Sequence, residues 1–183
     1  MGCVNLEKKI REPLQIHLQL VFKILYMAET LGSLVDKLSI KNLRIWHLDE
    51  ALENEKIPAS KREELKVKRD LADRQRQDLM NEVNGFLGAA LRGEVRIRDE
   101  KIKLYTNTNV SSSDGIKELG EAVSELAFRN IKIWHLEDEA RRTELPDASI
   151  VQTKREIDTT NQERNDLMDK VDEILSRCSG EKG

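Results

Sequence analysis

The chain has 183 residues, which is long enough for one domain with a buried core. Charged residues make up 36% and aromatic residues 4%, a mixture typical of long solvated helices. The net charge is -3, and Lys and Arg alternate with Asp and Glu, so the composition argues against a nucleic-acid-binding protein.

The cysteines and the apolar segments predict a cytoplasmic protein. Cys3 and Cys178 lie near opposite ends of the chain, and neither belongs to a Cys-x-x-Cys or Cys/His motif, so neither a disulfide framework nor a thiolate zinc site is expected. The apolar run at 14–28 contains polar residues and is too short to span a bilayer. No small-residue cleavage site follows it, so we expect neither a signal peptide nor a membrane segment.

The first half of the chain is predicted to be helical. After Pro13, apolar residues recur every three or four positions, which predicts a helix over 13–30. Two longer helices are expected over 31–54 and 59–90, on either side of a short turn. Residues 31–90 therefore form the first predicted helical hairpin.

The second half repeats this scheme after a connector at 94–113. In the first part of the connector, 94–105, apolar and charged residues alternate, which predicts a short β-hairpin. Helices are then expected over 115–143 and 148–177, again with a proline-containing turn between them. The second predicted hairpin spans 114–177.

A tandem duplication organises the chain, because the dipeptide Trp46-His47 returns 88 positions later as Trp134-His135. Laid over each other with this shift, from residue 31 to residue 87, the two units are identical at 18 of 57 positions. Most of the identities are apolar core positions, but six are polar. The polar pairs are Asn42/Asn130, His47/His135, Lys66/Lys154, Asp70/Asp158, Arg76/Arg164 and Asp78/Asp166.

The duplication predicts the fold class. A repeated unit of this length is one supersecondary element used twice, and a lone hairpin cannot bury its apolar face. The two hairpins should therefore pack into an antiparallel four-helix bundle, with the N-terminal helix and the short β-hairpin connector added to it. All residues from 1 to 183 would then form a single all-α domain.

Polar side chains interrupt the apolar stripes of these helices. On a helical wheel, Asn130 and Glu137 fall in the middle of the apolar stripe of 115–143, and Arg164 does so in 148–177. Antiparallel register places Glu137 opposite Lys154 and Asn130 opposite Asn161. In the first unit, the same register places Asp49 opposite Lys66 and Asn42 opposite Asp73. Because a lone buried charge costs several kcal/mol, these residues are expected to pair.

Two interpretations of this polar seam stay open. The seam can fix the register of the bundle, as a buried Asn does in a coiled coil. It can also line a pocket for a small polar ligand, since bundle cores host such sites. The ligand-binding candidates are Asn130, Glu137, Lys154, Asp158, Asn161 and Arg164.

The duplicated histidines lie on a different face of the helix. His135 falls on a second apolar stripe with Phe128 and Ile131, about 160° from the first stripe. His47 lies on the corresponding face of the first unit. A helix that is apolar on two sides should be central, and we expect the second side to contact either the other unit or a second copy, which predicts a homodimer.

Each histidine is followed three residues later by an acid, which raises the possibility of a metal site. Ferritin-like carboxylate sites use the reverse order, Glu-x-x-His, and add carboxylates from facing helices. Acid–histidine pairs at this spacing are also common contacts on helix surfaces. The metal-ligand candidates are His47, Glu50, Asp70, His135 and Asp138, and Asp158 is the equivalent of Asp70.

No motif defines a reaction or a cofactor. No serine or cysteine lies beside a histidine in a turn, and the sequence has no glycine-rich phosphate loop. The catalytic residues, the cofactor and the question of whether the protein is an enzyme are left open by the sequence.

Parts of both units resemble a known family. The run Ile133-Trp-His-Leu-Glu-Asp-Glu-Ala-Arg141, followed by Lys154-Arg-Glu-Ile-Asp158 and Asn161-Gln-Glu-Arg-Asn-Asp166, is similar to the bacterial family catalogued as domain of unknown function 4254. The run from Leu31 to His47 resembles the first unit of its members, and the resemblance covers about residues 31–177.

The resemblance implies little about chemistry. In the first unit, Leu52-Glu53 and Asp73-Arg74 replace the Ala-Arg and Asn-Gln pairs of the fuller pattern, so a ligand site is expected in the second unit. The family has no established activity. Its members are expected beside glycosyltransferases of envelope polysaccharides, which implies an accessory role in that pathway.

These observations favour a cytoplasmic helical bundle that acts by binding or assembly as a homodimer, without nucleic acid and without a membrane. The rival hypothesis is a metal-dependent enzyme, or one acting on a small polar ligand, whose site is built from the duplicated His and carboxylate residues.

Overall fold

The computed structural model describes residues 29–95, 97 and 113–179. The helices of these residues are α2 (Leu31–Glu53), α3 (Ala59–Leu91), α4 (Leu119–Ala140) and α5 (Asp147–Ser179). A short 3-10 helix, η1 (Ser113–Gly115), precedes α4. The four long helices agree with the two predicted hairpins to within a few residues. The prediction of an all-α chain built from tandem helical hairpins is therefore confirmed for the described residues.

The starts of α2 and α4 differ, although the two helices are repeats of each other. The hydroxyl of Thr30 caps α2 by accepting a hydrogen bond from the Ser33 N–H. At the start of α4, Glu118 makes no side-chain capping hydrogen bond. The α4 helix also begins later than the predicted residue 115, because the preceding residues form the η1 turn.

Two predicted elements are not supported. The helix expected over 13–30 lies outside the described residues except for Glu29 and Thr30, which are not helical. The β-hairpin expected over 94–105 is described only at residues 94, 95 and 97, and none of these is in a strand. Val95 and Ile97 are both buried in the core, at 5% and 0% exposure, as expected for apolar residues two positions apart, but neither lies in a strand.

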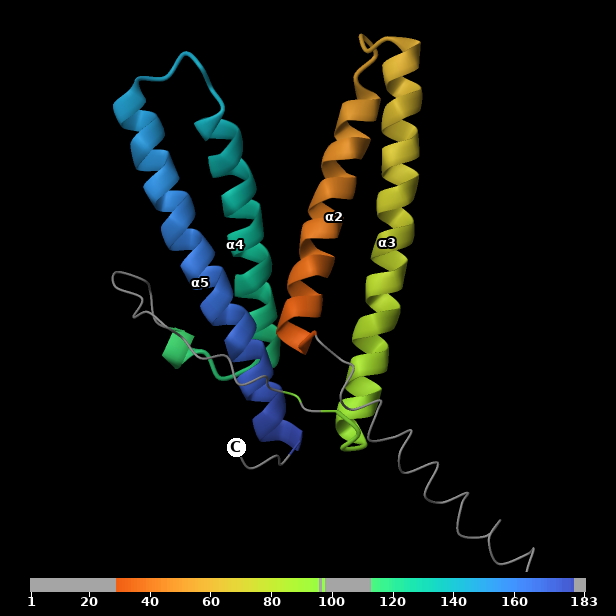
Figure 1. Cartoon of the computed structure of the whole chain (residues 1–183), viewed down its shortest axis with the longest axis vertical. Coiled ribbons are helices and arrows are strands. Elements are labelled where there is room, and N and C mark those ends of the chain that lie inside the picture. The colour runs from red at the N-terminus through yellow and green to blue at the C-terminus, as the bar shows by residue number, and fades with distance from the viewer. Residues whose placement is uncertain (1–28, 96, 98–112, 180–183) are drawn as a thin grey trace, which may run out of the picture.

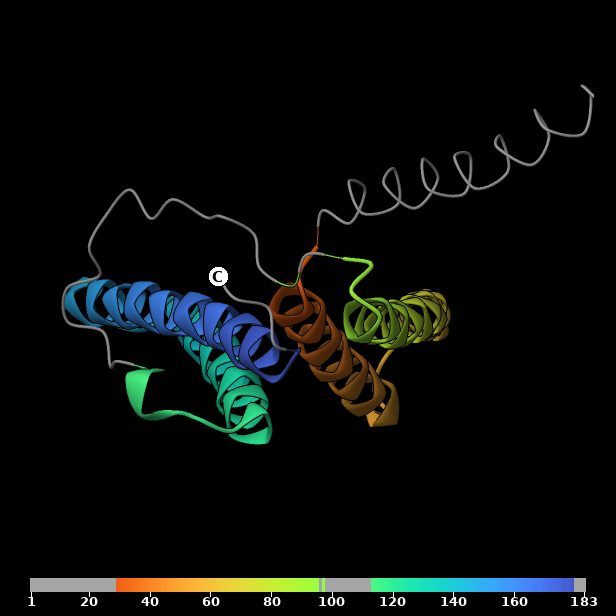
Figure 2. The same cartoon turned by 90° about the horizontal axis from the view of Figure 1, so that it is seen from below.

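The two hairpins meet at one end and diverge toward their turns (Figure 1). Each hairpin is antiparallel, and α2 and α4 both begin at the end where the hairpins meet (Figure 1). Seen from below, α2 lies between α3 and the second hairpin (Figure 2). Among the described residues, α2 packs on both α4 and α5, whereas α3 packs mainly on α2.

The apolar core lies at the end of the molecule where the two hairpins meet. Phe86, Ile97, Ala122 and Val171 are all fully buried there, and they come from both hairpins and the connector. Burying one such large side chain contributes about 1.5–3 kcal/mol, so this end holds the hairpins together. Farther toward the turns, Asn130 donates a hydrogen bond to Asp36, and His47 stacks on Trp134.

In the described ranges 29–95 and 113–179, no helix combines the length and the apolar character needed to cross a bilayer.

Candidate functional site

The contact between the hairpins includes a small buried polar cluster, which we call the polar joint: Asp36 and Ser39 of α2, Asn130 of α4 and Arg164 of α5. Asn130 and Asp36 are 4% and 6% exposed. The Nδ2 of Asn130 donates hydrogen bonds to Asp36 Oδ1, at 2.8 Å, and to Ser39 Oγ, at 2.6 Å. A single amide therefore ties the middle of α4 to two successive turns of α2.

Arg164 brings a positive charge to the same carboxylate. Its Nε lies 3.8 Å from Asp36 Oδ1, and its side chain is 25% exposed. This Nε is buried, and within the described part of the chain it has no hydrogen-bond partner. The Asp36 carboxylate thus has an amide donor and a nearby guanidinium, which offset the cost of removing it from water.

Below the polar joint, the backbone of α2 approaches α5 very closely. The Gly32 N–H, one of the free donors at the start of α2, donates to Asp172 Oδ1 at 2.8 Å. A Cβ on Gly32 would lie 2.2 Å from the carbonyl oxygen of Met168, closer than any real Cβ contact. Only glycine allows the helices to meet at this point.

Above the polar joint, an aromatic pair joins α2 to α4. The imidazole of His47 stacks on the indole of Trp134, with ring centroids 4.4 Å apart and planes inclined by 6°. The His47 Nδ1 lies 2.9 Å from Glu50 Oε2, which orients the ring. Offset or stacked aromatic pairs of this kind contribute about 0.5–1.5 kcal/mol beyond the area that they bury.

The stack predicts a change in tryptophan fluorescence. In a Trp46→Phe background, where Trp134 is the remaining tryptophan, His47→Ala should shift the emission to the red and raise quenching by acrylamide, because one face of the indole becomes exposed. Stability should fall by about 1 kcal/mol. The matched control is His135→Ala, since His135 is exposed. Equal spectra for the two variants would contradict the stack.

The sequence-predicted ligand residues do not all come together. Asn130 and Arg164 both lie in the polar joint. Glu137 is 43% exposed and pairs with Arg141 at 3.4 Å. Lys154 and Asp158 are exposed on α5, and Asn161 is half-buried. The prediction of a pocket that uses all six residues stays a prediction, and the structure gathers two of them.

The pairing predicted between the two helices of each hairpin is wrong in its partners. Asp49 accepts a hydrogen bond from Arg69 at 3.1 Å rather than pairing with Lys66, and this carboxylate raises the pKa of the Arg69 guanidinium. In the second hairpin, Arg129 pairs with Glu163 at 2.7 Å, close to the predicted register. Asn130, the next residue, nevertheless points to α2, because it lies on a different side of α4.

The metal candidates are also dispersed. His47 and Glu50 contact each other, but His135 is exposed and Asp138 pairs with Arg141 at 2.9 Å. Asp70 is exposed on α3. Across residues 29–95, 97 and 113–179, no group of three His, Cys, Asp or Glu side chains is placed to hold a metal ion.

Three residues of the contact were missed by sequence reasoning: Asp36, Ser39 and Asp172. They were missed because the search for polar residues used the repeat, and their counterparts are Ser124, Ala127 and Asn84. Asp36 could have been found as a polar residue on the apolar stripe of its helix, even though the second unit has no Asp at the matching position.

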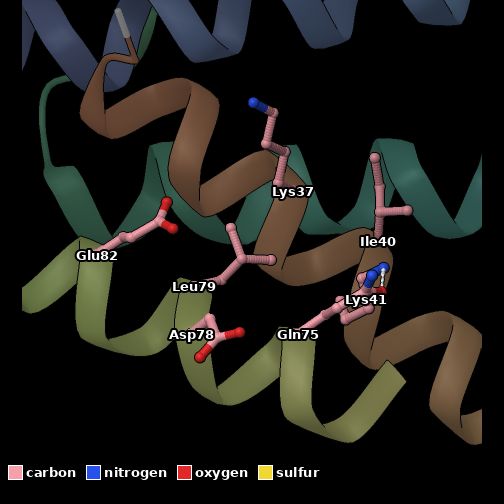
Figure 3. A pocket seen from close by; sticks show the side chains of 7 residues that line it. All are labelled: Lys37, Ile40, Lys41, Gln75, Asp78, Leu79 and Glu82. Atoms are coloured by element: carbon pink, nitrogen blue, oxygen red, sulfur yellow. Dashed lines mark hydrogen bonds between the residues drawn. The ribbon is translucent and has the colours of Figure 1, made fainter. Parts of the chain in front are cut away.

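A shallow groove of about 380 Å³ lies between α2 and α3 (Figure 3). Ile40 and Leu79 give it an apolar surface, and charged side chains surround them. A hydrogen bond of 2.7 Å from Lys41 Nζ to Gln75 Oε1 crosses one end (Figure 3). The groove contains none of the predicted ligand or metal residues, so the polar joint is the better candidate for a functional feature.

Two similar helical hairpins that meet at a buried polar joint define a duplicated all-helical protein. The chain belongs to the family described as "Protein of unknown function (DUF4254)", whose model matches residues 18–98 and 120–181. The resemblance seen in the sequence is thereby confirmed. No curated protein matches the chain, and no solved structure matches it.

Proposed function

We propose that the protein is an assembly module that binds a second copy of itself through the exposed apolar face of α4. The face consists of Phe128, Ile131 and His135, which follow one another at helical spacing. Phe128 is 57% exposed and Ile131 is 43% exposed. Adjacent exposed apolar side chains of this size are typical of protein–protein contacts.

The observation that supports this function most strongly is the contrast between the two repeats. In α2, the corresponding face contains Leu43 and His47, which are both half-buried, and His47 stacks on the second hairpin. In α4, the same face meets solvent. In α2 this face contacts the second hairpin. In α4 the same face is apolar but exposed, which fits a contact with another molecule.

Sedimentation and light scattering test this function. The wild-type chain should form a dimer at micromolar concentrations, and Ile131→Asp should convert it to a monomer, because a carboxylate would then have to be buried in the interface. The matched control is Val151→Asp on α5, where an apolar side chain is exposed to a similar extent, 49%, outside this face. A wild-type chain that stays monomeric would refute the proposal.

The predicted setting in envelope-polysaccharide synthesis and the cytoplasmic location stay predictions, since the family description states no activity. Self-assembly is the part of the proposed function that the geometry supports.

A further inference from the structure

The contact between the hairpins has two sides. Four positions of α2 enter the contact, and together we call them the docking face: Gly32, Asp36, Ser39 and His47. Five positions of the second hairpin lie against the docking face, and together we call them the receiving face: Asn130, Trp134, Arg164, Met168 and Asp172. Because the chain is a duplication, each hairpin carries both faces, and a single intramolecular contact uses one of each.

The contact within the chain leaves one docking face and one receiving face unused. These two faces carry many of the same residues as the faces that are in contact. A shift of 88 positions carries the docking face of α2 onto α4, where Gly120 and His135 are unchanged. The same shift carries the receiving face onto the first hairpin, where four of five residues are unchanged: Asn42, Trp46, Arg76 and Met80. Six of nine contact positions are identical, against 18 of 57 in the whole repeat, so identity is concentrated in the contact.

The unused faces are open in a single chain. Trp46 is 65% exposed and Met80 is 40% exposed, whereas their counterparts Trp134 and Met168 lie in the contact. A Cβ on Gly120 would meet no atom of residues 29–95, 97 or 113–179 within 4 Å, although the equivalent Gly32 is pressed against α5. Packing against the described part of the chain therefore gives no reason for a glycine at position 120.

We propose that the exposed face of α4 docks on the Trp46 side of the first hairpin in a second copy, repeating between chains the contact that joins the two hairpins within one chain. His135 of one copy then stacks on Trp46 of the other, as His47 stacks on Trp134. This inference rests on the proposed self-assembly and specifies its partner surface. A docking face and a receiving face on each chain let two copies close into a symmetric dimer of four hairpins.

The substitutions between the faces are compatible with this contact. Asn84 replaces Asp172, and its amide oxygen can accept a hydrogen bond from the Gly120 N–H at the start of α4, where Glu118 provides no side-chain cap. Ser124 replaces Asp36, and its hydroxyl can accept from Asn42. Since Ser124 carries no charge for Arg76, which already pairs with Asp73 at 2.6 Å, the contact between chains should be the weaker one.

A mixing experiment with two variants tests the proposal. Trp46→Glu blocks the receiving face, and Gly120→Leu blocks the docking face; both positions are exposed, so both variants should fold. Each variant alone should be monomeric in sedimentation velocity. Their mixture should form a mixed dimer, because the α4 face of Trp46→Glu meets an intact receiving face on Gly120→Leu. A dye on one variant follows the mixed species.

The outcomes separate this inference from the proposed function. If the α4 faces pair with each other, Trp46→Glu will dimerise as well as the wild type, which overturns the inference and leaves self-assembly in place. A mixture in which both variants stay monomeric also overturns it. A monomeric wild-type chain overturns both proposals.

Discussion

Replacing Gly32 with alanine is expected to lower the free energy of unfolding by about 3 kcal/mol. The added Cβ would lie 2.2 Å from the carbonyl oxygen of Met168 and 2.8 Å from its carbonyl carbon. These are backbone atoms of α5, so no side chain can rotate away to make room. The start of α2 must move, and with it the hydrogen bond of 2.8 Å from Gly32 to Asp172. Urea unfolding monitored by circular dichroism measures the loss.

The repeat supplies the control for this prediction. Gly120 occupies the equivalent position in α4, and a Cβ there would meet no atom of the described residues within 4 Å. In the Trp46→Glu background, where the proposed contact between chains is blocked, Gly120→Ala should be neutral or should stabilise the chain by up to about 1 kcal/mol, through helix propensity alone. Equal losses for the two variants would show that the close approach of α2 to α5 is not present in solution.

Replacing Asn130 with leucine is expected to cost about 3 kcal/mol, because it removes the amide that donates to a buried carboxylate. Asp36 is 6% exposed, and without the 2.8 Å bond from Asn130 it keeps the Arg164 guanidinium at 3.8 Å as its neighbour. Leucine fills a similar volume, so the loss reports on the polar contact rather than on a cavity. Thermal and urea unfolding both measure it.

Asn42→Leu is the matched control, since Asn42 is the same residue in the same repeat position but is exposed. In the Trp46→Glu background, where the proposed contact between chains is blocked, it should change stability by no more than about 0.5 kcal/mol. The double variant Asp36→Leu/Asn130→Leu should lose less than the sum of the single changes, because removing both partners leaves no buried group unpaired. Additive losses would contradict the polar joint.

The hairpins could be predicted from the sequence because their signals are local. Apolar residues spaced three and four apart, together with Pro58 and Pro146, predict the bounds of the four helices to within a few residues of those observed. The start of α4 is the largest error, and it falls beside the η1 turn, where no periodicity is available. The repeat showed in addition that both units have one architecture.

The polar contacts could be predicted only in part. The wheel correctly placed Asn130 and Arg164 on interior stripes, but it assigned Asn130 a partner in its own hairpin. Its actual partners, Asp36 and Ser39, lie 94 and 91 residues away in the sequence. A wheel shows where a side chain points around its own helix and carries no information about which helix stands opposite.

The sequence by itself determined the helical class, the two hairpins, the second apolar face of the first helix in each unit and the family. Only the tertiary structure decided that matching residues of the two repeats have different surroundings. Gly32 is pressed against α5 while Gly120 is open, and Trp134 is stacked while Trp46 is 65% exposed. The physical reason is that a single contact between two hairpins, each with a docking and a receiving face, uses one face of each and leaves the other two unused.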